Sequence, residues 1–117
     1  MSTGIQRPEQ DPQRALFGHL AWRRVPNTFS FHIPNGGRRS PIEAAIMKSL
    51  GVVPGIPNVL SIKDGRRFAL ELKAEGGSLS RAQLQALEQM RAAGAEVTTA
   101  VGIDEALGQL KAWGLLR

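Results

Sequence analysis

Residues 55–73 read GIPNVLSIKDGRRFALELK, and this segment sets the expected architecture around it. Two runs rich in apolar residues, 58–63 and 66–73, are typical of β-strands. The dipeptide between them, Asp64-Gly65, favours a two-residue turn, because both residue types tolerate the positive φ angles that such turns require. The segment therefore predicts an antiparallel hairpin that follows a Gly/Pro loop.

The open end of this hairpin carries polar residues suited to chemistry. Side chains alternate along a strand, so Glu71 and Lys73 share one face while Leu72 takes the other. The start of the first strand lies beside the end of the second, which places Asn58 next to Glu71. Glu71 could bind a divalent metal with the Leu72 carbonyl as a further ligand, and Lys73 could hold the attacking water. The alternative is an exposed surface pair on an edge strand, because Glu-x-Lys is a common tripeptide.

The composition limits which metal such a site would bind. The chain has no Cys and only two His, so disulfides and thiolate or ordinary zinc sites are not expected. Hard cations held by oxygen atoms, Mg²⁺ or Mn²⁺, are the expected choice.

Signals outside the hairpin predict a mixed α/β architecture. Ser40 to Glu43 and Ser80 to Gln83 each match a capping box at a helix start. Pro12 fits only the first turn of a helix, which makes Asp11 a candidate N-cap. The further elements expected are helices near 9–24, 41–50, 81–93 and 104–113, and strands at 28–33 and 96–101. This order predicts a mixed central sheet flanked by helices.

Several apolar residues are expected to face the interior. Leu16 and Leu20 form a stripe at helical spacing, and Leu107 and Leu110 do so in the last helix. One helix face is expected to carry Leu84, Leu87 and Met90. Trp22 and Trp113 are expected in the core or in a dimer interface.

Length and composition favour one globular domain. The chain has 117 residues, of which 42% are apolar. No apolar run approaches 18 residues, and the first ten residues lack the apolar core of a signal peptide. We therefore expect an intracellular, cytoplasmic protein with a flexible tail at residues 1–8.

The net charge of +5 is concentrated in the first third of the chain, where six arginines face Glu9 and Asp11. A localised basic surface is the usual footprint of nucleic-acid binding, with Arg38 and Arg39 able to contact phosphate. The alternative is a solvated surface that keeps the protein soluble.

Taken in order, these motifs resemble the virus-type replication-repair nuclease (VRR-NUC) domain of the PD-(D/E)xK superfamily. The resemblance covers residues 9–113 and assigns 9–117 to one domain with a restriction-endonuclease-like core. The segments that carry it are Pro34-Asn35-Gly36-Gly37, Gly51-Val52, Pro54-Gly55, Pro57-Asn58, Glu71-Leu72-Lys73-Ala74 and Leu79-Ser80 with Gln83.

The resemblance implies a structure-selective endonuclease that hydrolyses phosphodiester bonds in branched DNA such as Holliday junctions. Domains of this family occur in phages and bacteria and in DNA repair, so a phage or bacterial origin and a role in repair are implied as well. It implies Mg²⁺ or Mn²⁺ as cofactor and a homodimer as the assembly. The family's metal-binding Asp falls on Asn58, its metal-binding Glu on Glu71 and its Lys on Lys73. A further Glu falls on Glu9, and the Gln after the third strand falls on Gln83. Candidate DNA contacts are His32, Asn35, Arg38 and Arg39, although a structural role for His32 stays open.

Asn58 departs from the family pattern. An amide offers one neutral oxygen where Asp offers a full negative charge, so metal affinity should fall. We expect strongly reduced activity, whereas the alternative is that Asn58 suffices with extra water around the metal. Two other functions remain open: a non-catalytic DNA-binding module with a nuclease fold, and a protein-interaction domain whose basic surface meets an acidic partner.

Overall fold

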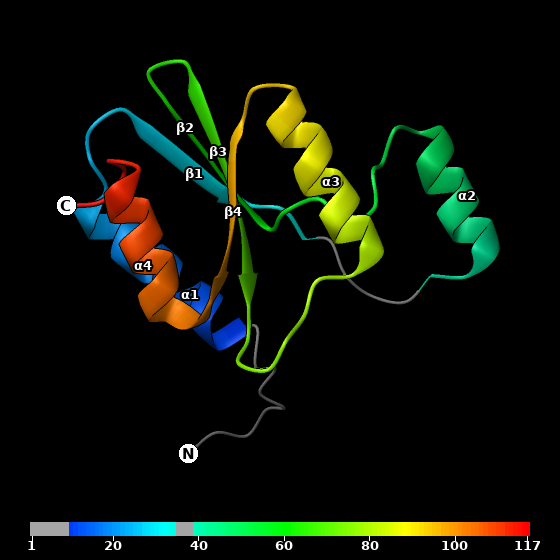
Figure 1. Ribbon diagram of the computed structural model, residues 1–117, viewed down its shortest axis with the longest axis horizontal. Helices are drawn as coiled ribbons and strands as arrows, with labels where there is room; N and C mark the ends of the chain where they lie inside the picture. The colour runs from blue at the N-terminus through cyan, green and yellow to red at the C-terminus, as the bar shows by residue number, and fades with distance from the viewer. Residues whose placement is uncertain (1–9, 35–38) are drawn as a thin grey trace.

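The computed structural model describes residues 10–34 and 39–117, and Figure 1 shows their arrangement. Helices and strands follow one another in the order predicted from the sequence. They are α1 (Gln10–Arg23), β1 (Thr28–His32), α2 (Pro41–Ser49), β2 (Val59–Lys63), β3 (Arg66–Lys73), α3 (Arg81–Ala92), β4 (Glu96–Val101) and α4 (Gly102–Ala112). The tail expected at residues 1–8 lies outside the described residues.

The four strands form one mixed sheet in the order β1-β2-β3-β4. The first three strands are antiparallel, and β4 joins β3 in parallel after the crossover through α3. A mixed sheet flanked by helices was predicted, and it is confirmed. Because β3 has a neighbour on each side, it is an interior strand and not an edge.

The core lies between one face of the sheet and the helices α1 and α4 (Figure 1). Leu16 and Leu20 of α1 and Leu110 of α4 are buried there, as the helical spacing predicted. The sheet contributes Val59, Phe68, Leu70 and Leu72, all on one side of their strands. Glu71 alternates with these residues and points to the opposite face, where it contacts Gln83 of α3. Helix α3 therefore covers the face that carries Glu71.

Local sequence signals fix the element boundaries well. Both capping boxes form, with Ser40 and Ser80 each accepting from the backbone N–H three residues on. Asp64 and Gly65 adopt φ angles of 51° and 77°, which make the tight hairpin turn.

Some predictions at the level of single residues are wrong. Helix α1 begins at Gln10, so Asp11 lies in its first turn and is not the N-cap. Ala86 and Leu87 are the buried residues of α3, whereas Leu84 is half exposed because it lies off the face toward the sheet. Trp22 is 70% exposed, so it is not part of the core, and its alternative place in a dimer interface stays a prediction. Trp113 packs against Phe68 with 5.1 Å between ring centroids, in agreement with a place in the core.

Helix α2 differs from the other helices. None of its residues is buried, and it lies beyond α3, away from the sheet (Figure 1). Ile42, Ile46 and Leu50 recur at a spacing of four and are all more than half exposed. They form a stripe along one side of the helix, which we call the α2 stripe. A nine-residue helix is marginal by itself, so its capping box is the main stabilising feature that the sequence provides.

No helix within residues 10–34 and 39–117 has the length and apolarity to cross a membrane.

Candidate active site

Four polar side chains converge at the open end of the β2–β3 hairpin. Asn58 immediately precedes β2, Glu71 and Lys73 lie near the end of β3, and Gln83 lies in the first turn of α3. We call these four side chains the polar cluster. The register pairs Val59 with Leu70, so the next position along brings Asn58 opposite Glu71, as the hairpin geometry predicted.

Glu71 is the buried carboxylate at the centre of the cluster. It is only 4% exposed, although it is a charged residue. Its Oε2 lies 3.6 Å from the Lys73 ammonium nitrogen and accepts a hydrogen bond from Gln83 Nε2 at 3.3 Å. Lys73 is itself largely buried. The alternative of an exposed pair on an edge strand is therefore wrong, because β4 and α3 cover this part of β3.

Gln83 has two structural partners at once. Its Oε1 accepts from the Ser80 backbone N–H at 2.8 Å, which completes the capping box of α3. Its Nε2 donates to Glu71 on the sheet. The capping box therefore also fixes the direction from which the amide approaches the carboxylate.

Gly55 allows α3 to come close enough for this contact. Its φ is +78°, and a Cβ there would lie 2.4–2.6 Å from backbone atoms of Ala82 and Gln83. Only glycine fits such a conformation and such a close approach. Sequence reasoning used Gly55 as part of a motif and missed this contact; a glycine flanked by Pro54 and Pro57 was the available signal.

Asn58 is held by the backbone of a single residue on β3. Its Oδ1 accepts from the Leu72 N–H at 2.9 Å, and its Nδ2 donates to the Leu72 carbonyl at 3.1 Å. These two bonds fix the orientation of the amide, because the N–H can only donate and the carbonyl can only accept. The last main-chain pair of β2 and β3 is Val59 with Leu70, and the Asn58 side chain extends the link between the strands to Leu72.

The main chain of Asn58 is held from the other side by β1. Its carbonyl accepts from the Ile33 N–H at 2.9 Å and from His32 Nδ1 at 2.8 Å. Because a carbonyl cannot donate, Nδ1 carries the proton in this pair. His32 is exposed and lies at the edge of the site.

This architecture is similar to that of solved structures over most of the chain. One solved chain described as a "VRR_NUC domain protein" matches with a TM-score of 0.73 and 21% sequence identity, over 94% of this chain and 90% of that one. A second, described as "VRR_NUC domain", matches with a TM-score of 0.59 and 20% identity, over 92% and 97% of the two chains.

The fold is that of a VRR_NUC domain. The resemblance read from the sequence motifs is confirmed at the level of the fold. No family model and no curated protein matches the sequence. A weaker match, with a TM-score of 0.44, 19% identity and coverage of 82% and 66%, is Hjc, a Holliday junction resolvase from Archaeoglobus fulgidus.

Within this VRR_NUC fold, the described residues do not fit a divalent metal ion. Glu71 offers one carboxylate, which already faces Lys73. The two neutral oxygens beside it, Asn58 Oδ1 and the Leu72 carbonyl, are both engaged in the amide pairing. The donor Nδ2 points at the carbonyl that would serve as a ligand. In residues 10–34 and 39–117, no three His, Cys, Asp or Glu side chains lie close enough together to hold a metal ion.

Three other residues assigned from the sequence, Glu9, Asn35 and Arg38, lie outside the described residues. Arg39 is exposed just before α2. Glu43 reaches back to the Ser40 backbone N–H and completes the capping box, in agreement with a structural role.

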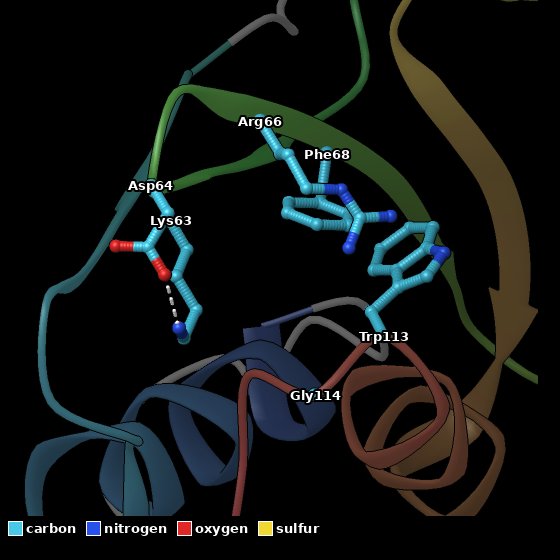
Figure 2. Close-up of a pocket in the computed structure, with 6 residues that line it drawn as sticks. All are labelled: Lys63, Asp64, Arg66, Phe68, Trp113 and Gly114. Atoms are coloured by element: carbon cyan, nitrogen blue, oxygen red, sulfur yellow. Dashed lines mark hydrogen bonds and ion pairs between the residues drawn. The ribbon is translucent and has the colours of Figure 1, made fainter.

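Two pockets flank the hairpin, one at each end. A pocket of about 230 Å³ lies at the turn end, where Arg66 sits over the Phe68 ring near Trp113 (Figure 2). It contains no residue of the polar cluster. A pocket of about 440 Å³ begins one residue beyond Lys73, between Ala74, Gly102 and the first turn of α1.

Proposed function

We propose that this chain is a DNA-binding protein built on an endonuclease fold, in which metal-dependent cleavage of branched DNA is strongly reduced by Asn58. The observation that carries the proposal is the polar cluster, in which Lys73 and Gln83 both contact Glu71 at the open end of the hairpin. A buried carboxylate with a lysine beside it, held on an interior strand, is typical of catalytic machinery.

Each member of the cluster has a proposed role in hydrolysis. Glu71 is the one carboxylate of the cluster, and together with an acidic side chain at position 58 it would bind Mg²⁺ or Mn²⁺, which would supply charge neutralisation on the phosphate and an activated water. The Lys73 ammonium is placed to orient a water molecule and to balance phosphate charge. Gln83 fixes one oxygen of Glu71. Asn58 lacks the second negative charge, which is why we propose strongly reduced activity.

DNA contact is proposed through the exposed groups around this end of the sheet. His32 is exposed and held beside Asn58, and Arg39 is exposed before α2. The basic excess of the first third of the chain supports attraction to phosphates, because Arg pairs well with phosphate oxygens. We propose Arg38 and Asn35 as additional contacts from the sequence pattern.

A homodimer is proposed as the working assembly. Two apolar surfaces among the described residues are available for it: the α2 stripe, and Phe29 and Ile62, which pair across β1 and β2 and are exposed. By strand alternation, Phe29 and Ile62 lie on the sheet face that carries Glu71, beside the part that α3 covers. A two-fold axis would allow the α2 stripe of each copy to pack on the open sheet face of the other.

A second candidate is a DNA-binding module without hydrolytic activity. The specific observation in its favour is the pairing of the Asn58 amide with both backbone groups of Leu72. In this case DNA binding would be the same with Mg²⁺ and with chelator.

The test compares the wild-type chain with Asn58→Asp and with Asn58→Asp/Glu71→Gln. Each is incubated with a four-way junction, a flap and a linear duplex in Mg²⁺, in Mn²⁺ and in chelator. We expect Asn58→Asp to cut branched DNA at least about 100-fold faster than wild type and the double variant not to cut. If Asn58→Asp binds DNA but cuts nothing, the hydrolytic proposal falls and the binding module stands.

A further inference from the structure

Asn58 links three neighbouring residues at the open end of the hairpin. Its side chain bonds the N–H and the carbonyl of Leu72, and its own carbonyl accepts from Ile33 and His32. Four hydrogen bonds thus join the loop before β2 to β3 on one side and to the end of β1 and the residue after it on the other. Main-chain pairing between β2 and β3 ends at Val59 and Leu70, so the amide supplies the last link between these strands.

An Asp at this position could not make the same pair of bonds. One carboxylate oxygen could accept from the Leu72 N–H, but the other would face the Leu72 carbonyl oxygen at about hydrogen-bond distance. Two oxygens with no proton between them repel each other, and a buried polar group left without a partner is costly. A cation between the two oxygens would remove the repulsion. In this chain the Nδ2–H of Asn58 fills that place.

The charge of Glu71 is also balanced without a metal ion. Its Oε2 lies within 3.6 Å of the Lys73 ammonium and accepts from Gln83. The cluster therefore combines one buried negative charge with one largely buried positive charge, and its amides bond to neighbouring groups. Such a network is stable by itself when its members are paired.

We infer that the Asn58 amide replaces the metal ion as the link between the Leu72 carbonyl and the start of β2, so that the site is complete and stable without a divalent cation. Asn58 is thus a structural clamp that closes the site. A metal ion could bind only by displacing the amide from Leu72. The inference deepens the proposed function, and its connection to cleavage rests on that proposal.

Thermal unfolding of the full chain tests this without DNA. Wild type, Asn58→Asp and Asn58→Ala are each unfolded in chelator, in Mg²⁺ and in Mn²⁺. We expect the wild-type Tm to be the same in all three. Asn58→Asp should lose about 5 °C or more in chelator and regain it with Mn²⁺, whereas Asn58→Ala should lose a similar amount in every condition.

Two further variants separate the effect of losing the amide bonds from the effect of adding a negative charge. Asn58→Ala removes the amide without adding a carboxylate, and Asn58→Asp/Glu71→Gln should lose the rescue by Mn²⁺. A wild-type Tm that rises with Mn²⁺ as much as that of Asn58→Asp would overturn the inference. So would an Asn58→Ala variant as stable as wild type.

A second measurement covers the case in which Asn58→Asp does not fold. Paramagnetic Mn²⁺ is titrated into ¹⁵N-labelled wild type while the Leu72 amide and the Asn58 side-chain NH₂ signals are followed. We expect both to stay sharp at millimolar Mn²⁺, and selective broadening of these signals would overturn the inference. If Asn58→Asp is rescued by metal but cuts no DNA, the clamp stands and the proposed hydrolysis falls.

Discussion

Helix α3, which supplies Gln83 to the polar cluster, and helix α2 start with the same local sequence signals but lie in opposite environments. Both α2 and α3 open with a serine-led capping box, and both have a positive-φ glycine nearby. In α3 the box places Gln83 against the buried Glu71. In α2 the box opens a helix with no buried residue. Capping signals therefore specify where a helix begins, whereas burial decides how much the helix contributes to global stability.

Substitutions of Gly55, which packs against α3, and of Gly51, which follows α2, should give the largest difference in unfolding free energy between these regions. Gly55→Ala would drive a Cβ into the backbone of Ala82 and Gln83, so we expect a loss of about 4 kcal/mol in unfolding free energy. Gly51, after α2, has a φ of +92° but open space around it. Gly51→Ala adds backbone strain of about 1 kcal/mol. Because α2 buries no residue and can open locally, the global unfolding free energy should fall by less than that. Urea unfolding measures both, and equal losses would contradict the role of close packing at Gly55.

Substitutions of Lys73 in the polar cluster and of Lys48 in α2 should give the next largest difference in unfolding free energy. Lys73→Met leaves Glu71 buried without its cation, which should lower the unfolding free energy by about 3 kcal/mol. Lys48 is exposed in the last turn of α2, so Lys48→Met should cost less than about 1 kcal/mol. Chemical denaturation of the two variants side by side checks the contrast. A Lys73→Met variant as stable as Lys48→Met would mean that the ion pair adds nothing to the fold.

The two capping serines should have smaller effects, and on different observables. Ser80→Ala removes a cap from α3, and we expect a loss of about 1 kcal/mol in global stability because α3 packs on the sheet. Ser40→Ala removes the same bond from α2. It should speed hydrogen exchange of the α2 amides and leave the unfolding midpoint of the monomer unchanged, at a protein concentration too low for the proposed homodimer, since α2 buries no residue within one chain. An equal shift of the midpoint in both variants would show that α2 is coupled to the core.

The smallest effect on monomer stability is expected at the α2 stripe. Ile46 is more than half exposed, so Ile46→Asp should leave the unfolding of the monomer within about 0.5 kcal/mol of wild type. Sedimentation should nevertheless show dissociation of the proposed homodimer, because the charge would lie in the apolar interface. Ala44 lies on the opposite side of the helix, and Ala44→Asp is the matched control. A wild-type chain that sediments as a monomer at high concentration would remove the homodimer proposal.

Much of the candidate site could be predicted from short-range sequence patterns. Alternation placed Glu71 and Lys73 on one face of β3, and the Asp64-Gly65 turn fixed the register that brings Asn58 opposite Glu71. The capping box at Ser80 located the start of α3, and so the position of Gln83. These signals are local, because they depend on turn chemistry and on the two-residue period of a strand.

The sequence by itself therefore determined the order of elements, the hairpin and its register, and the two helix starts. Only the tertiary structure decided that Glu71 is buried, because β4 reaches β3 through a long crossover that no local pattern specifies. It also decided that the Asn58 amide bonds the backbone of Leu72, and that α2 buries none of its residues. The physical reason is that hydrogen-bond partners and burial depend on which distant segments meet, whereas turns and caps depend on neighbours in the chain.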